Sequence, residues 1–125
     1  REQVRAFISD IRRLVHDLTP HPATVGLASA AGLPLVLDLD LDFHQVHWYD
    51  RLDRHGPLER HVGEFGTGRP VLLGEFPTRG SRRGVPDILH TVRQSGYAGA
   101  LAWSALGEDR ASDAGLLEAG LRGFP

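Results

Sequence analysis

The chain has 125 residues, of which 41% are apolar and 24% charged, as expected for one globular domain with a modest core. Its net charge of −2 gives no electrostatic reason to bind nucleic acid or an anionic membrane, and no apolar run is long enough to span a bilayer. Cysteine is absent, which excludes disulfides and thiolate chemistry.

The N-terminal third predicts a helix followed by a short strand. Apolar residues recur at the i, i+3, i+4, i+7 spacing of an amphipathic helix over residues 2–18, and Pro20 ends the pattern. The small apolar residues of 24–29 favour a strand. For residues 33–39 we expect a short helical turn or irregular structure.

Residues 41–49 are rich in aromatic and β-branched side chains and predict a second strand. Alternation places Gln45 and His47 on one face, and His44 and Trp48 on the other. A short helix is predicted over residues 57–65, and its expected inward residues are Leu58, His61, Val62 and Phe65.

Residues 70–76 predict a strand that ends in a single carboxylate. An apolar run bounded by Pro and Gly is typical of a parallel strand buried on both faces. Glu75 stands at its C-terminal end, where a carboxylate is costly to bury without partners or a role. Strict alternation places Glu75 on the same face as Val71 and Leu73.

The rest of the chain predicts a helix, a strand and a last helix. Pro86 suits the first turn of a helix that ends near Gly96, and residues 99–103 form a short buried strand. Ser112 or Asp113 can cap the final helix. Its expected inward residues are Leu116, Leu117 and Leu121.

This alternation predicts an α/β fold with about four parallel strands and outer helices. The helix 2–18 leads, and residues 24–121 hold four βα units within a single partial domain, 1–125. No glycine-rich dinucleotide turn or phosphate loop follows a strand. Three predicted strands end in residues suited to one pocket, and alternation lets their faces converge. These residues are His47 with Tyr49, Glu75, and Trp103 with Ser104.

In order and spacing, three motifs resemble the last strands of clan A glycoside hydrolases, the (β/α)8-barrel cellulases, β-mannanases and related β-glycosidases. The motifs are His47-Trp-Tyr49, Gly74-Glu75-Phe76 and Gly99-Ala-Leu-Ala-Trp103-Ser104. The resemblance runs over residues 20–105 and implies the C-terminal half of a (β/α)8 TIM barrel, strands five to eight. It implies that Glu75 is the catalytic nucleophile, that His47 and Tyr49 support it, and that Trp103 forms the floor under the reacting sugar. Trp48 is expected either to pack between strand and helix or to bind the sugar as a second platform.

The chain departs from this family in one important respect. The family's acid/base Glu follows an Asn at the end of strand four, and this sequence contains no Asn. Because Met is also absent, we expect the chain to be a processed product, an artificial piece or a segment of a longer polypeptide. Retaining glycosidases need two carboxyl groups about 5–5.5 Å apart. We therefore expect negligible turnover from the isolated chain.

Half a barrel would leave two strand edges unpaired, so the isolated chain is not expected to be a monomer. The predicted partners are a β-glycan or β-glycoside, together with the missing N-terminal half or a second copy of the chain. No cofactor is expected. A non-catalytic half-barrel that homodimerises, and binds carbohydrate or has only a structural role, is the alternative. A (β/α)8 lyase or aldolase is disfavoured because no Lys is present for Schiff-base chemistry.

Other groups of residues give weaker indications of a functional site. Alternation points His44 and His47 to opposite faces, which argues against a metal pair. The stretch Asp38-Leu-Asp-Leu-Asp42 resembles the start of a calcium loop but lacks its Gly and final Glu, so we expect Asp42 to be structural. The loop with Arg79, Arg82 and Arg83 is either solvated or anion-binding. Glu64 and Glu108 are the rival carboxylates, and neither ends an apolar strand.

Overall fold

The computed structural model contains one sheet of four parallel strands in the order β1-β2-β3-β4. It describes residues 1–104 and 109–124, without the side chain of His55. The strands are β1 (Gly26–Leu27), β2 (His44–His47), β3 (Val71–Pro77) and β4 (Gly99–Trp103). The α-helices are α1 (Glu2–Leu18), α2 (Val85–Gln94) and α3 (Ala114–Arg122), and the 3-10 helices are η1 (Ala30–Leu35), η2 (Asp50–His55) and η3 (Val62–Phe65). The predicted α/β class with about four parallel strands is confirmed.

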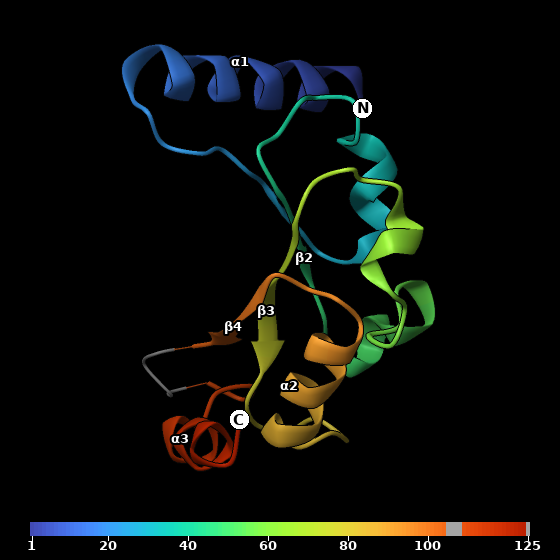
Figure 1. Ribbon diagram of the computed structural model, residues 1–125, viewed down its shortest axis with the longest axis vertical. Helices are drawn as coiled ribbons and strands as arrows, with labels where there is room; N and C mark the ends of the chain where they lie inside the picture. Colours follow the sequence, from blue (N-terminus) through green and yellow to red (C-terminus); the bar gives the residue numbers. More distant parts are fainter. Residues whose placement is uncertain (105–108, 125) are drawn as a thin grey trace.

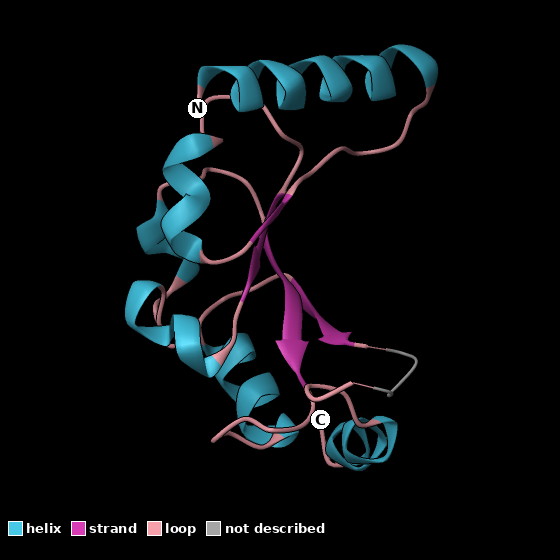
Figure 2. Cartoon of the chain, turned by 180° about the vertical axis from the view of Figure 1, so that it is seen from behind, coloured by secondary structure: helices cyan, strands magenta, loops and turns pink. Residues whose placement is uncertain are grey.

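The core lies on one side of this sheet. Figures 1 and 2 show α2 and the 3-10 helices together on that side. One cluster packs α2 against β3 and β4 around Leu73, Phe76 and Ile88, which are at most 1% exposed. A second packs η1 and η3 against the first strands around Leu33 and Val46. No helix among the described residues is long and apolar enough to cross a membrane.

The opposite face of the sheet is largely uncovered. Leu101 and Trp103 of β4 point to this side and are 54% and 42% exposed. Among the described residues, no strand pairs with the outer edge of β1 or β4. The sheet is therefore open at both edges and on one face.

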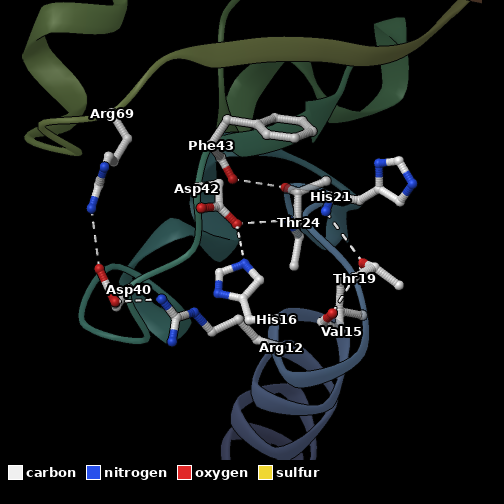
Figure 3. Close-up of polar contacts among 11 residues, drawn as sticks. Arg12, Val15, His16, Thr19, His21, Thr24, Asp40, Asp42, Phe43 and Arg69 are labelled. Atoms are coloured by element: carbon white, nitrogen blue, oxygen red, sulfur yellow. Dashed lines mark hydrogen bonds and ion pairs between the residues drawn. The ribbon is translucent and has the colours of Figure 1, made fainter.

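Helix α1 lies at the end of the molecule away from α3 (Figure 1) and contains no buried residue. Its apolar seam, made by Val4, Phe7, Ile11, Leu14 and Leu18, is 44–72% exposed. Polar contacts from its other side hold it to the body. His16 Nε2 lies 2.8 Å from Asp42 Oδ2, and Arg12 and Arg69 both bind Asp40 (Figure 3). Arg5 completes the series with two bonds to the Asp38 carboxylate.

The calcium-like stretch therefore anchors a helix. Asp42 accepts the Ala23 N–H at 2.7 Å as well as its contact with His16. The lowered pKa of Asp42 has the same causes, first the Ala23 N–H and then His16. These contacts confirm the expected structural role of Asp42.

Two expectations about helices were wrong. Residues 57–65 form a turn and then η3, because Gly63 and the left-handed Gly66 (φ 66°) interrupt an α-helix there. His61 is exposed and accepts the Gly63 N–H instead of facing inward. Helix α3 is capped by Asp113 as expected. However, of its expected inward residues only Leu117 packs against the core; leucines 116 and 121 are half exposed, and buried Gly120 lies against Val85.

Candidate functional site

A carboxylate, a phenol and an imidazole meet where β2 and β3 end. Glu75 Oε1 accepts a hydrogen bond from the Tyr49 hydroxyl. Glu75 Oε2 lies 3.4 Å from Nδ1 of His47. The Glu75 and His47 side chains are only 22% and 23% exposed. The three residues that the sequence placed at these strand ends are thus brought into direct contact.

A bulge in β3 makes this contact possible. Val46 pairs with Leu73, but the next residue, His47, pairs with Glu75, so Gly74 is an extra residue in β3. Val71 and Leu73 point into the buried core, whereas Glu75 points to the open face with His47. Strict alternation, which placed Glu75 beside Val71 and Leu73, was therefore wrong.

Two glycines leave room for side chains of the site. A Cβ on Gly74 would lie 2.1 Å from Cγ of Gln45, and one on Gly26 would lie 2.9 Å from Nε2 of His47. Gln45 in turn places its amide nitrogen 3.5 Å from His47 Nε2. Neither glycine was assigned a role from the sequence. A Gly inside a strand pattern, which often marks a bulge or a close approach, was the available signal.

Tyr49 is held as a hydrogen-bond donor. Burial first, and then the hydrogen bond and the charge of Glu75, raise the pKa of the Tyr49 phenol far above its usual range. The guanidinium of Arg51, 5.4 Å from the ring centroid, acts in the opposite direction. The phenol is therefore protonated at neutral pH and donates to a carboxylate oxygen.

Trp103 is the last residue of β4, so it lies at the same C-terminal end of the parallel strands as His47 and Glu75. It pairs with Pro77 of β3, two residues beyond Glu75. Its indole N–H donates to Asp109 Oδ2 at 2.6 Å, and 42% of the residue is exposed. An exposed indole at this edge can stack on the C–H face of a sugar. Asp109 was not singled out by the sequence analysis.

Trp48 packs between the sheet and α2, which is the first of the two roles expected for it. It is 2% exposed and belongs to the core cluster between the sheet and α2. Its indole N–H donates to Asp53 at 2.8 Å, and the Arg83 guanidinium lies 5.7 Å from the ring centroid. The ring therefore presents no open face to a sugar in this structure.

The rival carboxylates and the other groups considered from the sequence have surroundings different from those of Glu75. Glu64 is exposed on η3 beside Arg60, and Glu108 lies outside the described residues. Within the described part of the chain, no three His, Asp or Glu side chains are grouped to hold a metal ion. In the basic loop, Arg82 pairs with Asp50 and Arg83 with Glu59. A cavity of about 300 Å³ beneath this loop, bounded by α2 and α3, does not include Glu75.

Comparisons of the chain with protein-family models, with curated proteins and with solved structures found no match.

Proposed function

We propose that this chain is the C-terminal half of a (β/α)8 barrel and carries the nucleophile of a retaining β-glycoside hydrolase. The observation that carries the proposal is the Glu75 carboxylate, which accepts the Tyr49 hydroxyl and faces His47 at the C-terminal edge of a parallel sheet. In parallel α/β folds this edge is where catalytic side chains gather. Trp103 supplies an exposed aromatic surface at the same edge.

The chemistry requires Glu75 to attack as an anion. One carboxylate oxygen bonds to the anomeric carbon as the glycosidic bond breaks, and an acid outside this chain protonates the leaving oxygen. Water then hydrolyses the glycosyl ester. The Tyr49 donor orients the nucleophile and stabilises its charge before attack. Because Oε1 accepts the Tyr49 hydroxyl, the second oxygen, Oε2, lies on the side of His47.

The open sheet supports the half-barrel part of the proposal. Strands β1 and β4 have free outer edges, and the uncovered face carries apolar Leu101 beside Trp103. A second unit of four parallel strands would pair with both edges and bury that face. The missing N-terminal half is the partner that also supplies the acid/base.

A second copy of the chain is the alternative partner. Because all four strands are parallel, a twofold axis would place β4 of one copy beside β1 of the other, and the reverse. Such a dimer would be a non-catalytic carbohydrate-binding or structural half-barrel. Sedimentation gives the mass in solution, and a mass equal to one chain would contradict self-pairing.

Covalent trapping tests the nucleophile. A 2-deoxy-2-fluoro-β-glycoside with a dinitrophenolate leaving group needs no protonation to depart, so trapping does not depend on the absent acid. Mass spectrometry of the chain, alone and mixed with N-terminal halves of clan A barrels, should find the sugar on the peptide that contains Glu75. The Glu75→Gln variant should remain unlabelled, and Glu64→Gln is the matched control that should label normally. Labelling of Glu75→Gln at the wild-type rate, or of no protein at all, would overturn the assignment.

A further inference from the structure

Both tryptophans of this chain donate their indole N–H to an aspartate. Trp48 donates to Asp53 at 2.8 Å and Trp103 to Asp109 at 2.6 Å. Trp48 is buried, so its donor needs a protein partner. Trp103 is 42% exposed, so water could satisfy its N–H equally well. The contact between Asp109 and Trp103 is thus not required by burial.

Asp109 is itself firmly held. Its second oxygen, Oδ1, accepts the Ser112 hydroxyl at 2.6 Å and the Ala111 N–H at 2.7 Å. Ser112 is fully buried, with 0% exposure, so the surrounding residues hold its hydroxyl in place as a donor to Asp109. One carboxylate therefore joins the indole at the end of β4 to the segment that leads into α3.

The same segment is bonded to the end of β3. The Thr78 N–H donates to the Ala111 carbonyl at 2.9 Å, and the Thr78 hydroxyl accepts the Asp113 N–H at 2.7 Å. Thr78 is 6% exposed and follows Glu75 by three residues. Through Thr78, the carboxylate that holds Trp103 has a fixed position relative to the candidate nucleophile.

We propose that Asp109 is a positioning residue that sets the plane of the Trp103 indole for stacking on a sugar bound at Glu75, an inference that rests on the proposed function. A planar ring must be held at one angle to contact the C–H face of a pyranose, and a side chain free to rotate loses part of that contact. Asp109 does this without touching substrate.

Asp109 is not the missing acid. Hydrogen bonds from Ser112, then Ala111, and also from Trp103 lower the pKa of Asp109, so the carboxylate is ionised at neutral pH. It has no proton to give a leaving group under those conditions. Its negative charge also helps to raise the pKa of Tyr49, the donor to the candidate nucleophile.

Nuclear magnetic resonance of the full 125-residue chain tests the contact directly, because two tryptophans give only two indole N–H signals. Trp103→Phe assigns them. In Asp109→Ala the Trp103 signal should move upfield and exchange faster with water, while the Trp48 signal stays in place. The matched control, Asp53→Asn, should move the Trp48 signal alone. An unmoved Trp103 signal in Asp109→Ala would overturn the proposal.

Sugar binding tests the purpose of the contact. Titration with cellotetraose and mannotetraose should show affinity lower by about 3- to 10-fold in Asp109→Ala, approaching that of Trp103→Ala. The Glu75 labelling rate at saturating reagent should change less than twofold, because the nucleophile is intact. Wild-type affinity in Asp109→Ala would overturn the positioning role. Absence of sugar binding and labelling in the wild type would overturn the proposed function, and the indole signals would still decide whether Asp109 orients Trp103.

Discussion

His47 and Glu75 face each other across β2 and β3, with Nδ1 of the imidazole 3.4 Å from Oε2 of the carboxylate. This pairing exists because Gly74 is an extra residue in β3 that turns Glu75 from the core to the open face. Without the bulge, a carboxylate would point among side chains such as Leu73, which is fully buried. The position of the site therefore depends on a residue that has no side chain.

Replacing Gly74 by Ala should disrupt this arrangement. The new Cβ would meet the Gln45 side chain at 2.1 Å, which requires movement of Gln45 or of the bulge. We expect the free energy of unfolding to fall by about 1–3 kcal/mol, measured by urea denaturation. Gly123→Ala is the control, because nothing lies within 4 Å of its added Cβ. Equal effects of the two substitutions would contradict the close approach of Gln45 to Gly74.

Removal of the Tyr49 hydroxyl should slow covalent labelling at Glu75. Tyr49→Phe leaves the ring but removes the donor to Oε1, so the carboxylate is less well oriented for attack. A loss of about 100-fold in labelling rate is expected. Tyr97→Phe is the matched control, because Tyr97 packs edge-on against Phe65 in the core, away from the carboxylate. The nucleophile would need reassignment if both variants labelled at the wild-type rate.

The buried His44 predicts a loss of stability in mild acid. His44 is 1% exposed and its Nδ1 has no hydrogen-bond partner. Burial first, and then the charge of Arg69, lower the pKa of His44 below its ordinary value. The unfolded chain thus binds a proton at higher pH than the folded chain does. Stability should be complete above about pH 6.5 and should fall as the pH drops through the lowered pKa.

Urea denaturation at a series of pH values measures this slope. His44→Phe removes the titrating group and should flatten the curve below about pH 6.5. His90→Gln, at an exposed position on α2, is the control for replacement of a histidine outside the core. The lowered pKa of Asp42 acts in a separate window, below about pH 4. A slope that survives in His44→Phe would show that another group is responsible.

Helix α1 should detach when its aspartate anchors are weakened. Asp42→Asn keeps an acceptor for the Ala23 N–H but removes the charge that faces His16. Hydrogen–deuterium exchange should become faster over Glu2–Leu18 and stay unchanged over Val85–Gln94. Asp10→Asn is the matched control, because Asp10 pairs with Arg13 inside α1 itself. Added salt should also speed exchange in the wild type. Slow exchange in Asp42→Asn would mean that apolar contacts such as those of Ile8 hold the helix.

The sequence predicts this fold well where one periodic pattern dominates. The apolar stripe over residues 2–18 matches α1 residue for residue, and the strand predicted over residues 70–76 matches β3 within one residue at each end. Predictions failed where local breakers compete with a pattern. Residues 57–65 have helical spacing, but glycines convert them to a turn and a short 3-10 helix. The predicted strand over 41–49 shrinks to His44–His47, because only those residues pair with β3, and only Gln45 and Val46 also pair with β1.

The residues of the candidate site were identified from the sequence, but their arrangement was not. His47, Tyr49 and Glu75 were identified from their places at strand ends, and they do come together. The bulge was not predicted because alternation assumes a regular pleat. A single Gly in a strand sequence does not show whether the pairing register shifts at that position. Asp109 escaped because its role depends on its contacts with Ser112 and Trp103, which no periodic pattern in the sequence indicates.

The strand order β1-β2-β3-β4 has a kinetic consequence. Every strand pairs with the next strand in the sequence, so no pairing has to wait for a distant part of the chain. Pairings between consecutive strands cost less loop-closure entropy than pairings between distant strands would, which favours assembly from one end to the other. We expect β3, α2 and β4 to form a folding nucleus, since the larger of the packed clusters surrounds them. Strand β3, which carries Glu75, would then be in place before β1 and α1 join it.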